Sequence, residues 1–414
     1  MKIRIHKHIG FHFKRFHGHI TKYLYERDTI FATAWVFIFI LVLKFVFSLN
    51  THFLDPISLA FEDFDLNDLA YSQLGEKKDS IDKRIVIVNI GHADREELAF
   101  LIEKTHALGP KVMGLDSYFE GPRDSVKDAA LREVFEKTPN LVVVSRIHWD
   151  HHTGKGEMKE DFFQEAFHQT GFGNLTGEDL GTKRHISGYE KIDDSVHYCF
   201  AGQIVRNYDA KAFRKFAKRK EHNEIINYTR RSDRYLVLEP DDVMSRELTD
   251  TVLKDKIVLL GYVNPDPNDI EDKVFTPMNE KFAGKSHPDM NGIVVHANFI
   301  SMILDKDYIN QLPLWVNILF AIVIGWLHMS FFIRYYLENH IWFHLVAKLA
   351  QLASAVFFVF AGIYLYDRFN IKLDMKLTLV VIVLSVDIIY FYEAFAVWMH
   401  KRFGYTTVFH QKHH

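Results

Sequence analysis

Carboxylates that follow apolar runs are the residues of this sequence with the clearest potential for ligand chemistry. Asp116 comes directly after the apolar run 111–115. If that run is a strand of a parallel sheet, Asp116 lies at its carboxyl end, where such sheets usually bind ligands. Together with Asp94, Asp124 and Asp128, Asp116 could line a polar or cation-binding site. Asp94, Asp116 and Asp124 are therefore the candidate ligand-binding residues, and a strand-end residue capping the next loop is the alternative for Asp116.

Three charged residues lie inside long apolar runs. Asp387 is near the middle of the last run, Glu393 is nearer one end of it, and Lys348 is near one end of the run before. Charges in hydrocarbon are costly and usually face a partner or a water-filled path. Lys348 and Glu393 fall at similar depth by residue count, so we expect them to pair. All three charges would then hold the helices or a partner subunit together, and ion conduction through Asp387 is the alternative.

Histidines gather in three places without the spacing of a metal site. The HWDHH run at 148–152 combines imidazole and carboxylate, which suits zinc, copper or nickel. Adjacent histidines rarely converge on one ion, so a solvated loop is the preferred interpretation. The histidines within 6–19 and 400–414 lie in basic or aromatic segments, which are typical of a chain resting on anionic lipid. A metal or pH-sensing role is the alternative there, and no metal site or cofactor is predicted.

Motifs of common enzymes are missing from the sequence. It has no phosphate-binding loop, nucleophile elbow, CxxC pair or HExxH motif, so nothing supports an enzyme. The acidic segment 266–272 lacks EF-hand spacing and is interpreted as a surface loop. A net charge of −3 gives no support for nucleic acid binding, and the single cysteine, Cys199, excludes an intramolecular disulfide.

Four apolar runs are long enough to cross a membrane as helices. The segment before the first run carries seven Lys and Arg residues against Glu26 and Asp28, which places it in the cytoplasm. The basic loop 367–376 would then lie outside the cytoplasm, which disagrees mildly with the positive-inside rule. The predicted divisions are a cytoplasmic N-terminus (1–28), transmembrane helices (29–49, 314–333, 345–366 and 377–399), an extracytoplasmic domain (50–312) and a cytoplasmic tail (400–414).

The segment between the first and second apolar runs alternates strand and helix signals. Short β-branched runs are separated by amphipathic stretches, which is typical of a mostly parallel sheet covered by helices on both faces. The expected strands are 84–90, 111–115, 141–147 and 256–262, and the expected helices are 96–108, 127–137 and 291–304. The fold class is therefore an α/β extracytoplasmic domain joined to four transmembrane α-helices.

Four segments of this domain resemble the second type of CHASE domain, an extracellular sensory module associated with cyclases and histidine kinases. The resemblance covers about 55–305, with one apolar run before it and three after it, a layout that the family often shows. The segments are DFDLNDLAYSQL leading into DKRIVIVNIG (63–91), PKVMGLDSYFEG (110–121), GFGNL followed by a charged turn and an arginine (171–184), and KDKIVLLGY followed by an acidic loop and NGIVVHANFISMIL (254–304).

The resemblance implies a sensor, although the family usually carries an output domain after its last membrane helix. Only about fifteen residues follow Met399, too few for a kinase or cyclase domain. We therefore expect a non-catalytic sensor or adaptor in a bacterial inner membrane, with both termini cytoplasmic and the large domain periplasmic. Its expected partners are membrane lipids and a membrane or envelope protein that supplies the output, with a homo-oligomer left open. The alternatives are a structural subunit of an envelope complex and an ion-coupled transport component that uses Asp387.

Overall fold

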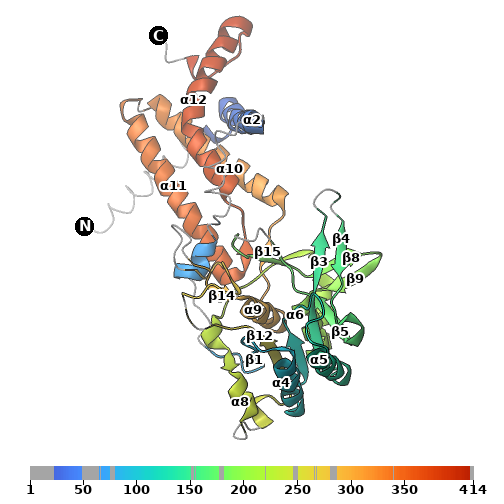
Figure 1. Ribbon diagram of the computed structural model, residues 1–414. Coiled ribbons are helices and arrows are strands. Elements are labelled where there is room, and N and C mark those ends of the chain that lie inside the picture. Colours follow the sequence, from blue (N-terminus) through green and yellow to red (C-terminus); the bar gives the residue numbers. More distant parts are fainter. Residues whose placement is uncertain are drawn as a thin grey trace, which may run out of the picture. The chain divides into compact units, whose positions relative to one another are not determined.

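The chain forms two compact units, which are described separately: Met1–Asn67 with Asn310–His414, and Asp68–Ile309. Figure 1 shows the computed structural model with its elements labelled. The structure describes residues 23–48, 65, 67–74, 80–150, 153, 155–176, 181–219, 221–245, 250–264, 266, 268–279, 287–338 and 340–410. The predicted histidine-rich segment at 6–19 lies outside these residues.

The unit Asp68–Ile309 is built on a mixed sheet that has seven strands among the described residues. Its spatial order is β11-β1-β12-β2-β3, and both β4 and β5 pair with β3. The strands are β1 (Ile85–Asn89), β2 (Val112–Leu115), β3 (Leu141–Trp149), β4 (Gly156–Lys159), β5 (Gln169–Phe172), β11 (Leu236–Leu238) and β12 (Ile257–Gly261). Each of the four predicted strand runs forms one of these strands.

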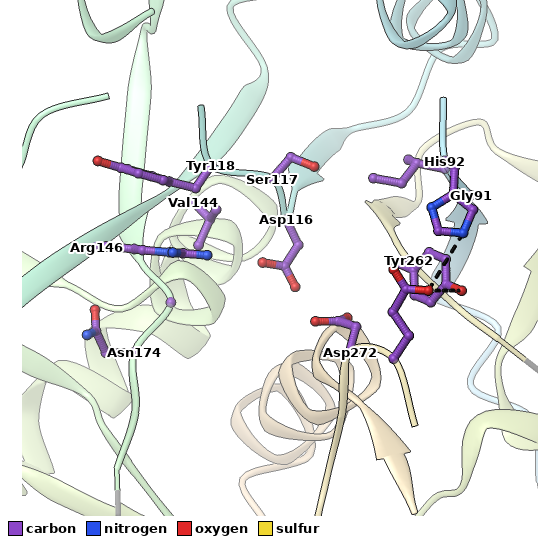
Figure 2. A pocket seen from close by; sticks show the side chains of 13 residues that line it. Gly91, His92, Asp116, Ser117, Tyr118, Val144, Arg146, Asn174, Tyr262 and Asp272 are labelled. Carbon is purple, nitrogen blue, oxygen red and sulfur yellow. Dashed lines mark hydrogen bonds and ion pairs between the residues drawn. The ribbon is translucent and has the colours of Figure 1, made fainter. Parts of the chain in front are cut away.

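Within this sheet the neighbouring strands run parallel, except for β3 and β4. The antiparallel β3–β4 hairpin extends β3 through His148 and Trp149, where the sequence predicted a loop. Further along that run, 151–152 lie outside the described residues. The prediction of an α/β domain is confirmed, and the prediction of a mostly parallel sheet is met in part. Gly91, Asp116 and Tyr262 lie one or two residues after the carboxyl ends of β1, β2 and β12, and they surround one space in Figure 2.

Helices cover both faces of the sheet. One face carries α4 (Arg95–Ala107), α5 (Ser125–Lys137) and α8 (Pro240–Met244), and the other carries α6 (Phe200–Tyr208) and α9 (Gly292–Asp305), with α7 (Ala210–Arg219) packed on these two. On the α6 and α9 face, two glycines let the helices approach closely. A Cβ on Gly114 would lie 2.6 Å from Ile204, and a Cβ on Gly261 would lie 2.8 Å from Ile293.

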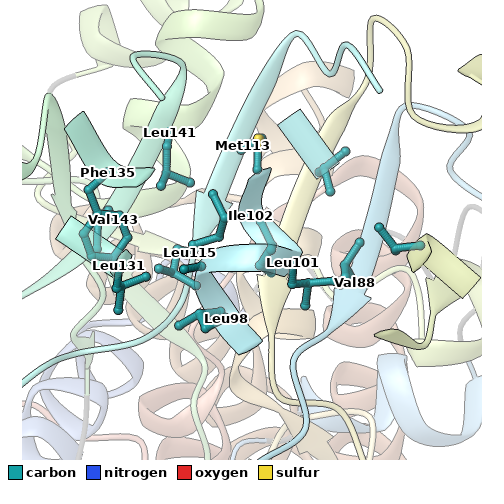
Figure 3. Close-up of a cluster of buried hydrophobic side chains, with 14 of the residues drawn as sticks. Val88, Leu98, Leu101, Ile102, Met113, Leu115, Leu131, Phe135, Leu141 and Val143 are labelled. Carbon is teal, nitrogen blue, oxygen red and sulfur yellow. The ribbon is translucent and has the colours of Figure 1, made fainter. Parts of the chain in front are cut away.

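The apolar core on the α4 and α5 face is formed by alternate strand residues and by the buried stripe of each helix. Val88, Leu115 and Val143 point from three strands toward Leu101 and Leu131, and all five are at most 1% exposed (Figure 3). Because successive strand residues point to opposite faces, the neighbouring residues of the same strands are buried under α6 and α9. Burial on both faces explains why these strands are continuous apolar runs in the sequence.

Several small elements complete the unit. Among the described residues, a three-stranded antiparallel sheet and two short two-stranded pairs accompany the main sheet, and short helical turns occur elsewhere along the chain. They are β6 (Leu175–Thr176), β7 (His185–Ser187) and β10 (Asn223–Ile225); β8 (Tyr189–Ile192) and β9 (Ser195–Tyr198); β13 (Lys273–Val274) and β14 (Met290–Asn291); 3-10 turns at Gln164–Ala166, Ser232–Arg234 and Asp250–Val252; and a π turn at Ala70–Leu74.

The C-terminal end of α9 is anchored to the start of β1 by charged and hydroxyl groups. Ser301 donates a 2.8 Å hydrogen bond to Asp82, and Arg84 forms a 2.8 Å ion pair with Asp305 and a 2.6 Å ion pair with Asp82. Burial alone would raise the pKa of Asp82, but Arg84 and Ser301 hold it at about 2. These contacts fix the direction of α9, whose other end begins at the strand ends described above.

The unit that contains Asn310–His414 has four helices among the described residues that are long and apolar enough to cross a membrane. They are α2 (Arg27–Ser48), α10 (Leu314–Glu338), α11 (His340–Phe369) and α12 (Lys376–Phe403), and β15 (Asn310–Gln311) pairs with β16 (Ile371–Lys372) in the loop before α12. The prediction of four apolar helices is confirmed. α12 packs against the other three helices (Figure 1). At the α10–α12 contact, a Cβ on Gly325 would lie 2.6 Å from Val381, so only glycine allows this close approach.

The predicted tail at 400–414 folds back along the start of α2. Gly404, with a φ of +69°, ends α12 and turns the chain. The carboxylate of Asp28, which is 2% exposed, then accepts four hydrogen bonds. The donors are the hydroxyls of Tyr392 (2.6 Å), Tyr405 (3.0 Å) and Thr407 (3.0 Å) and the amide of Val408 (2.7 Å). One buried carboxylate therefore connects the first described helix to the last described segment.

Candidate functional site

A cavity of about 420 Å³ opens at the carboxyl ends of the central strands of the α/β unit. Its walls come from the loops after β1, β2, β12 and β5 and from β3 itself, and include Gly91, Asp116, Arg146, Asn174 and Tyr262. Open parallel sheets usually bind ligands at this edge, and the volume is within the ordinary range for small-molecule sites. The sequence-based placement of Asp116 at a strand end is thus what the structure shows.

Asp116 faces the cavity as a carboxylate without a bonded partner. Its backbone amide donates to Leu260, 2.9 Å away, which closes the β2–β12 ladder. Its side chain is half-buried and makes no hydrogen bond to another residue that the structure describes. Burial raises the pKa of Asp116 to about 6, and the positive charge of Arg146 opposes that rise.

Asp272 supplies a second carboxylate to the same cavity. Burial and the nearby charge of Asp116 raise its pKa to about 6, against smaller opposing effects of the Gly292 amide and Arg146. A Cβ on Gly292 would lie 3.7 Å from Oδ2 of Asp272 and 3.8 Å from Oδ2 of Asp116, so both carboxylates flank the first residue of α9. Figure 2 shows the two carboxylates pointing toward one another. The positive end of the α9 dipole lies beside them and partly offsets their repulsion.

The opposite wall of the cavity carries positive charge. The guanidinium of Arg146 lies 4.8 Å from the ring centre of Tyr118, and the amine of Lys159 lies 5.0 Å from it. Tyr118 is held by its hydroxyl, which donates to the carbonyl of Glu160 at 2.6 Å. Arg146 extends toward Asp116 from β3 (Figure 2). The cavity therefore has an acidic side and a basic side.

At the rim, hydrogen bonds fix the loops. Asn174 accepts from the amide of Ile147 at 2.8 Å and donates to its carbonyl at 2.9 Å, which joins the end of β5 to β3. The hydroxyl of Tyr262 donates to Glu271 at 3.2 Å, and His92 lies 3.7 Å from the same carboxylate.

The structure does not bring Asp94 and Asp124 to Asp116, and neither lines the cavity. Asp94 is the N-cap of α4, where it accepts from the amides of Glu96 and Glu97, and it also pairs with Lys127. Asp124 caps α5 in the same way. Carboxylates at these positions satisfy free amides of the first helical turn. Both predicted ligand residues therefore have a capping role, and Asp128, the fourth acid considered, pairs with Arg95 at 2.5 Å.

The predicted pairing of the intramembrane charges needs a correction. Lys348 pairs with Asp387, with 3.5 Å between Nζ and Oδ1, and not with Glu393. Glu393 instead accepts a 2.6 Å hydrogen bond from the hydroxyl of Tyr336 on α10. Counting residues from the ends of 345–366 and 377–399 put Lys348 and Glu393 at equal depth. The packing of α11 against α12 sets which residues meet, and a count of residues along each helix does not give it.

Two charged residues that face Asp116 across the cavity, Arg146 and Asp272, were not singled out from the sequence. Arg146 is an exposed charge inside the apolar strand β3, and that break in the apolar pattern is a signal that could have found it. Asp272 belongs to the segment 266–272, which was interpreted as a surface loop, and it has a left-handed φ of +53°. No local sequence pattern places it beside Asp116, because the two are joined only through the fold. The described residues contain no group of three or more side chains suited to a metal ion.

All four segments of the sequence resemblance contribute to this one cavity. The first supplies Gly91, the second Asp116, the third Asn174, and the fourth both Tyr262 and Asp272. The model of the CHASE2 domain family matches residues 33–331, more than two thirds of the chain. A comparison with curated proteins found no match, and neither did a comparison with solved structures.

Proposed function

Because the chain belongs to the CHASE2 domain family, whose members are extracellular sensory domains, we propose that it is a membrane sensor whose ligand binds in the Asp116 cavity. The observation that carries this proposal is the convergence of four separate segments on one cavity that holds two carboxylates of raised pKa. Strongly shifted carboxyl groups in a cavity are a common mark of functional sites.

The ligand that suits this cavity is a small organic cation or a zwitterion. A positive group between Asp116 and Asp272 would relieve the repulsion of two ionised carboxylates and replace the water lost on burial. Arg146, on the opposite wall, suits a carboxylate at the other end of the same molecule. An amino acid or a related amine combines both groups.

The sensor acts without catalysis of its own in this proposal. Ser117 and His92 both line the cavity, but no hydrogen bond joins them among the described residues, so a serine nucleophile activated by this histidine has no geometric support. Output passes to a partner protein in the bacterial inner membrane. The large domain of the sensor itself is periplasmic. This orientation agrees with the four apolar helices and with the basic segment 1–28, which the positive-inside rule places in the cytoplasm.

Thermal unfolding of the full-length protein in nanodiscs tests the cavity. Amino acids, polyamines and betaines are added one at a time. A binder should raise Tm as its concentration increases, because it adds about 2.7 kcal/mol to the free energy of unfolding at a hundredfold excess over Kd. Asp116→Asn and Asp272→Asn should abolish the increase. Arg146→Ala should weaken the binding only of ligands that carry a carboxylate.

Asp124→Asn is the matched control for this test. Asparagine caps a helix as well as aspartate does, so this variant keeps its fold and should keep the full response. An undiminished response in Asp116→Asn would refute the cavity as the binding site. If no small molecule binds and one protein co-purifies in fixed ratio, the structural-subunit alternative is favoured, whereas a current driven by voltage would favour transport through Asp387.

A further inference from the structure

The Lys348–Asp387 ion pair lies on the surface of the four-helix unit. Its atoms are 3.5 Å apart, and each side chain is 56% exposed. This separation is longer than the 2.7–2.9 Å typical of a charge-assisted hydrogen bond. Neither side chain makes a hydrogen bond to any other residue in the described part of the chain. Both charges therefore retain unused capacity for a further partner.

The depth of Asp387 makes this exposure costly. It lies 11 residues after Lys376 and 16 before Phe403 in α12, roughly 16 and 24 Å from the two helix ends at 1.5 Å per residue. An aspartate side chain is too short to reach either interface from there. At that depth a charge open to lipid is strongly unfavourable, so intramembrane charges almost always face protein or water.

The side chains around the ion pair form an apolar seam along α11 and α12. Leu345 and Leu352 on α11 are 54% and 64% exposed, and Val383 and Phe391 on α12 are 53% and 57% exposed. Apolar side chains alone need no partner in lipid, because hydrocarbon tails are equally apolar. The ion pair is the feature that requires cover, and the apolar side chains supply the surface that packs around it.

We propose that a second copy of this chain covers the pair, in a two-fold symmetric dimer through α11 and α12. Two copies inserted in the same direction are related by an axis along the membrane normal, and this rotation leaves the depth of every residue unchanged. Because Lys348 and Asp387 lie at one depth, the rotation places each lysine opposite the aspartate of the other copy. Four alternating charges then satisfy one another inside protein. A partner with a single charge would leave one member of the pair uncovered, whereas the chain is complementary to itself.

Native mass spectrometry of the full-length chain in mild detergent tests this interface. We expect a dimer for the unmodified chain and about tenfold weaker association, ~1.4 kcal/mol, for Lys348→Glu and for Asp387→Lys. Each variant alone brings like charges together. When the two variants are co-expressed with different tags, they should form a mixed dimer, since one copy then carries two acids and the other two lysines. A pair that acts only within one chain cannot produce this rescue.

Two further variants distinguish loss of the dimer interface from loss of the fold. Lys348→Leu combined with Asp387→Leu makes the seam wholly apolar, so this variant should keep its Tm in nanodiscs and yet dimerise more weakly. Lys44→Glu changes an exposed lysine on α2 and should leave the dimer intact. Monomers of the unmodified chain in both detergent and nanodiscs would overturn the proposal. The same holds if single variants dimerise normally or co-expressed variants remain unmixed.

Discussion

At the scale of single residues, Asp116 and Asp272 couple the charge of the cavity to the stability of the fold. The pKa of each is raised from 3.8 to about 6, so the folded state holds protons that the unfolded chain releases at lower pH. The contribution of these two carboxyl groups to stability is therefore greatest below about pH 4 and is lost as the pH rises through 6. Arg146 limits this loss because its positive charge faces both carboxylates.

Asp116→Asn should therefore stabilise the ligand-free protein at neutral pH. Removing the charge removes its desolvation cost, which we expect to be about 1–2 kcal/mol after allowance for solvent screening. Thermal unfolding of the full-length protein in nanodiscs should show a higher Tm than the unmodified chain at pH 7.5 and an equal Tm at pH 4. A lower Tm at pH 7.5 would mean that the carboxylate caps a loop, the alternative left open by the sequence.

At the scale of the elements, the aspartates at the starts of α4 and α5 stabilise the fold, whereas the charge of Asp116 destabilises it. Asp94 satisfies two amides of the first turn of α4, and Glu97 bonds back to the amide of Asp94. Asp94→Ala should lower Tm by a few degrees, and Asp94→Asn should recover most of that loss because its amide oxygen still accepts. Neither change should alter the ligand response measured by thermal shift. If either variant lost the ligand response but kept its Tm, Asp94 would have to be part of the binding site.

The main strands and helices were predictable from the sequence because their patterns are local. Strands such as β1 and β12 are buried on both faces, so they appear as continuous apolar runs, and the neighbouring helices carry periodic apolar residues. The antiparallel hairpin of β3 and β4 was not predictable, since β4 is exposed and carries no apolar pattern. Short strands such as β6 and β13, with two residues each, are likewise too short to leave a pattern in the sequence.

Only part of the candidate site could be predicted. Asp116 was found because the end of a strand can be recognised locally, and parallel sheets usually bind ligands at the carboxyl ends of their strands. Asp272 meets Asp116 only through the tertiary fold, beside Gly292, the first residue of α9. The pairing of Lys348 depended on the register between two helices, which a count of residues along each helix cannot give.

At the scale of the whole molecule, the orientation in the membrane can be tested without breaking the chain. Asp194 is a fully exposed turn residue of the α/β unit, and Arg402 is exposed at the end of α12. The single native cysteine, Cys199, is buried and gives little background. In spheroplasts, a membrane-impermeant maleimide should label Asp194→Cys at once and Arg402→Cys only after permeabilisation. Labelling of Arg402→Cys in intact spheroplasts would contradict the model with both ends in the cytoplasm.

The hydrogen bonds of Asp28 have a consequence for the time at which the membrane unit can assemble. Asp28 enters the membrane boundary with the first helix, but the amide of Val408 that it binds lies 380 residues later in the chain. At about 5–20 residues per second, a ribosome needs roughly 20 to 80 seconds to synthesise that distance. Throughout this interval the carboxylate lacks these hydrogen-bond donors, so we expect α2 to take its final position only after they have been synthesised. Final packing of the first helix is therefore a late event in biosynthesis.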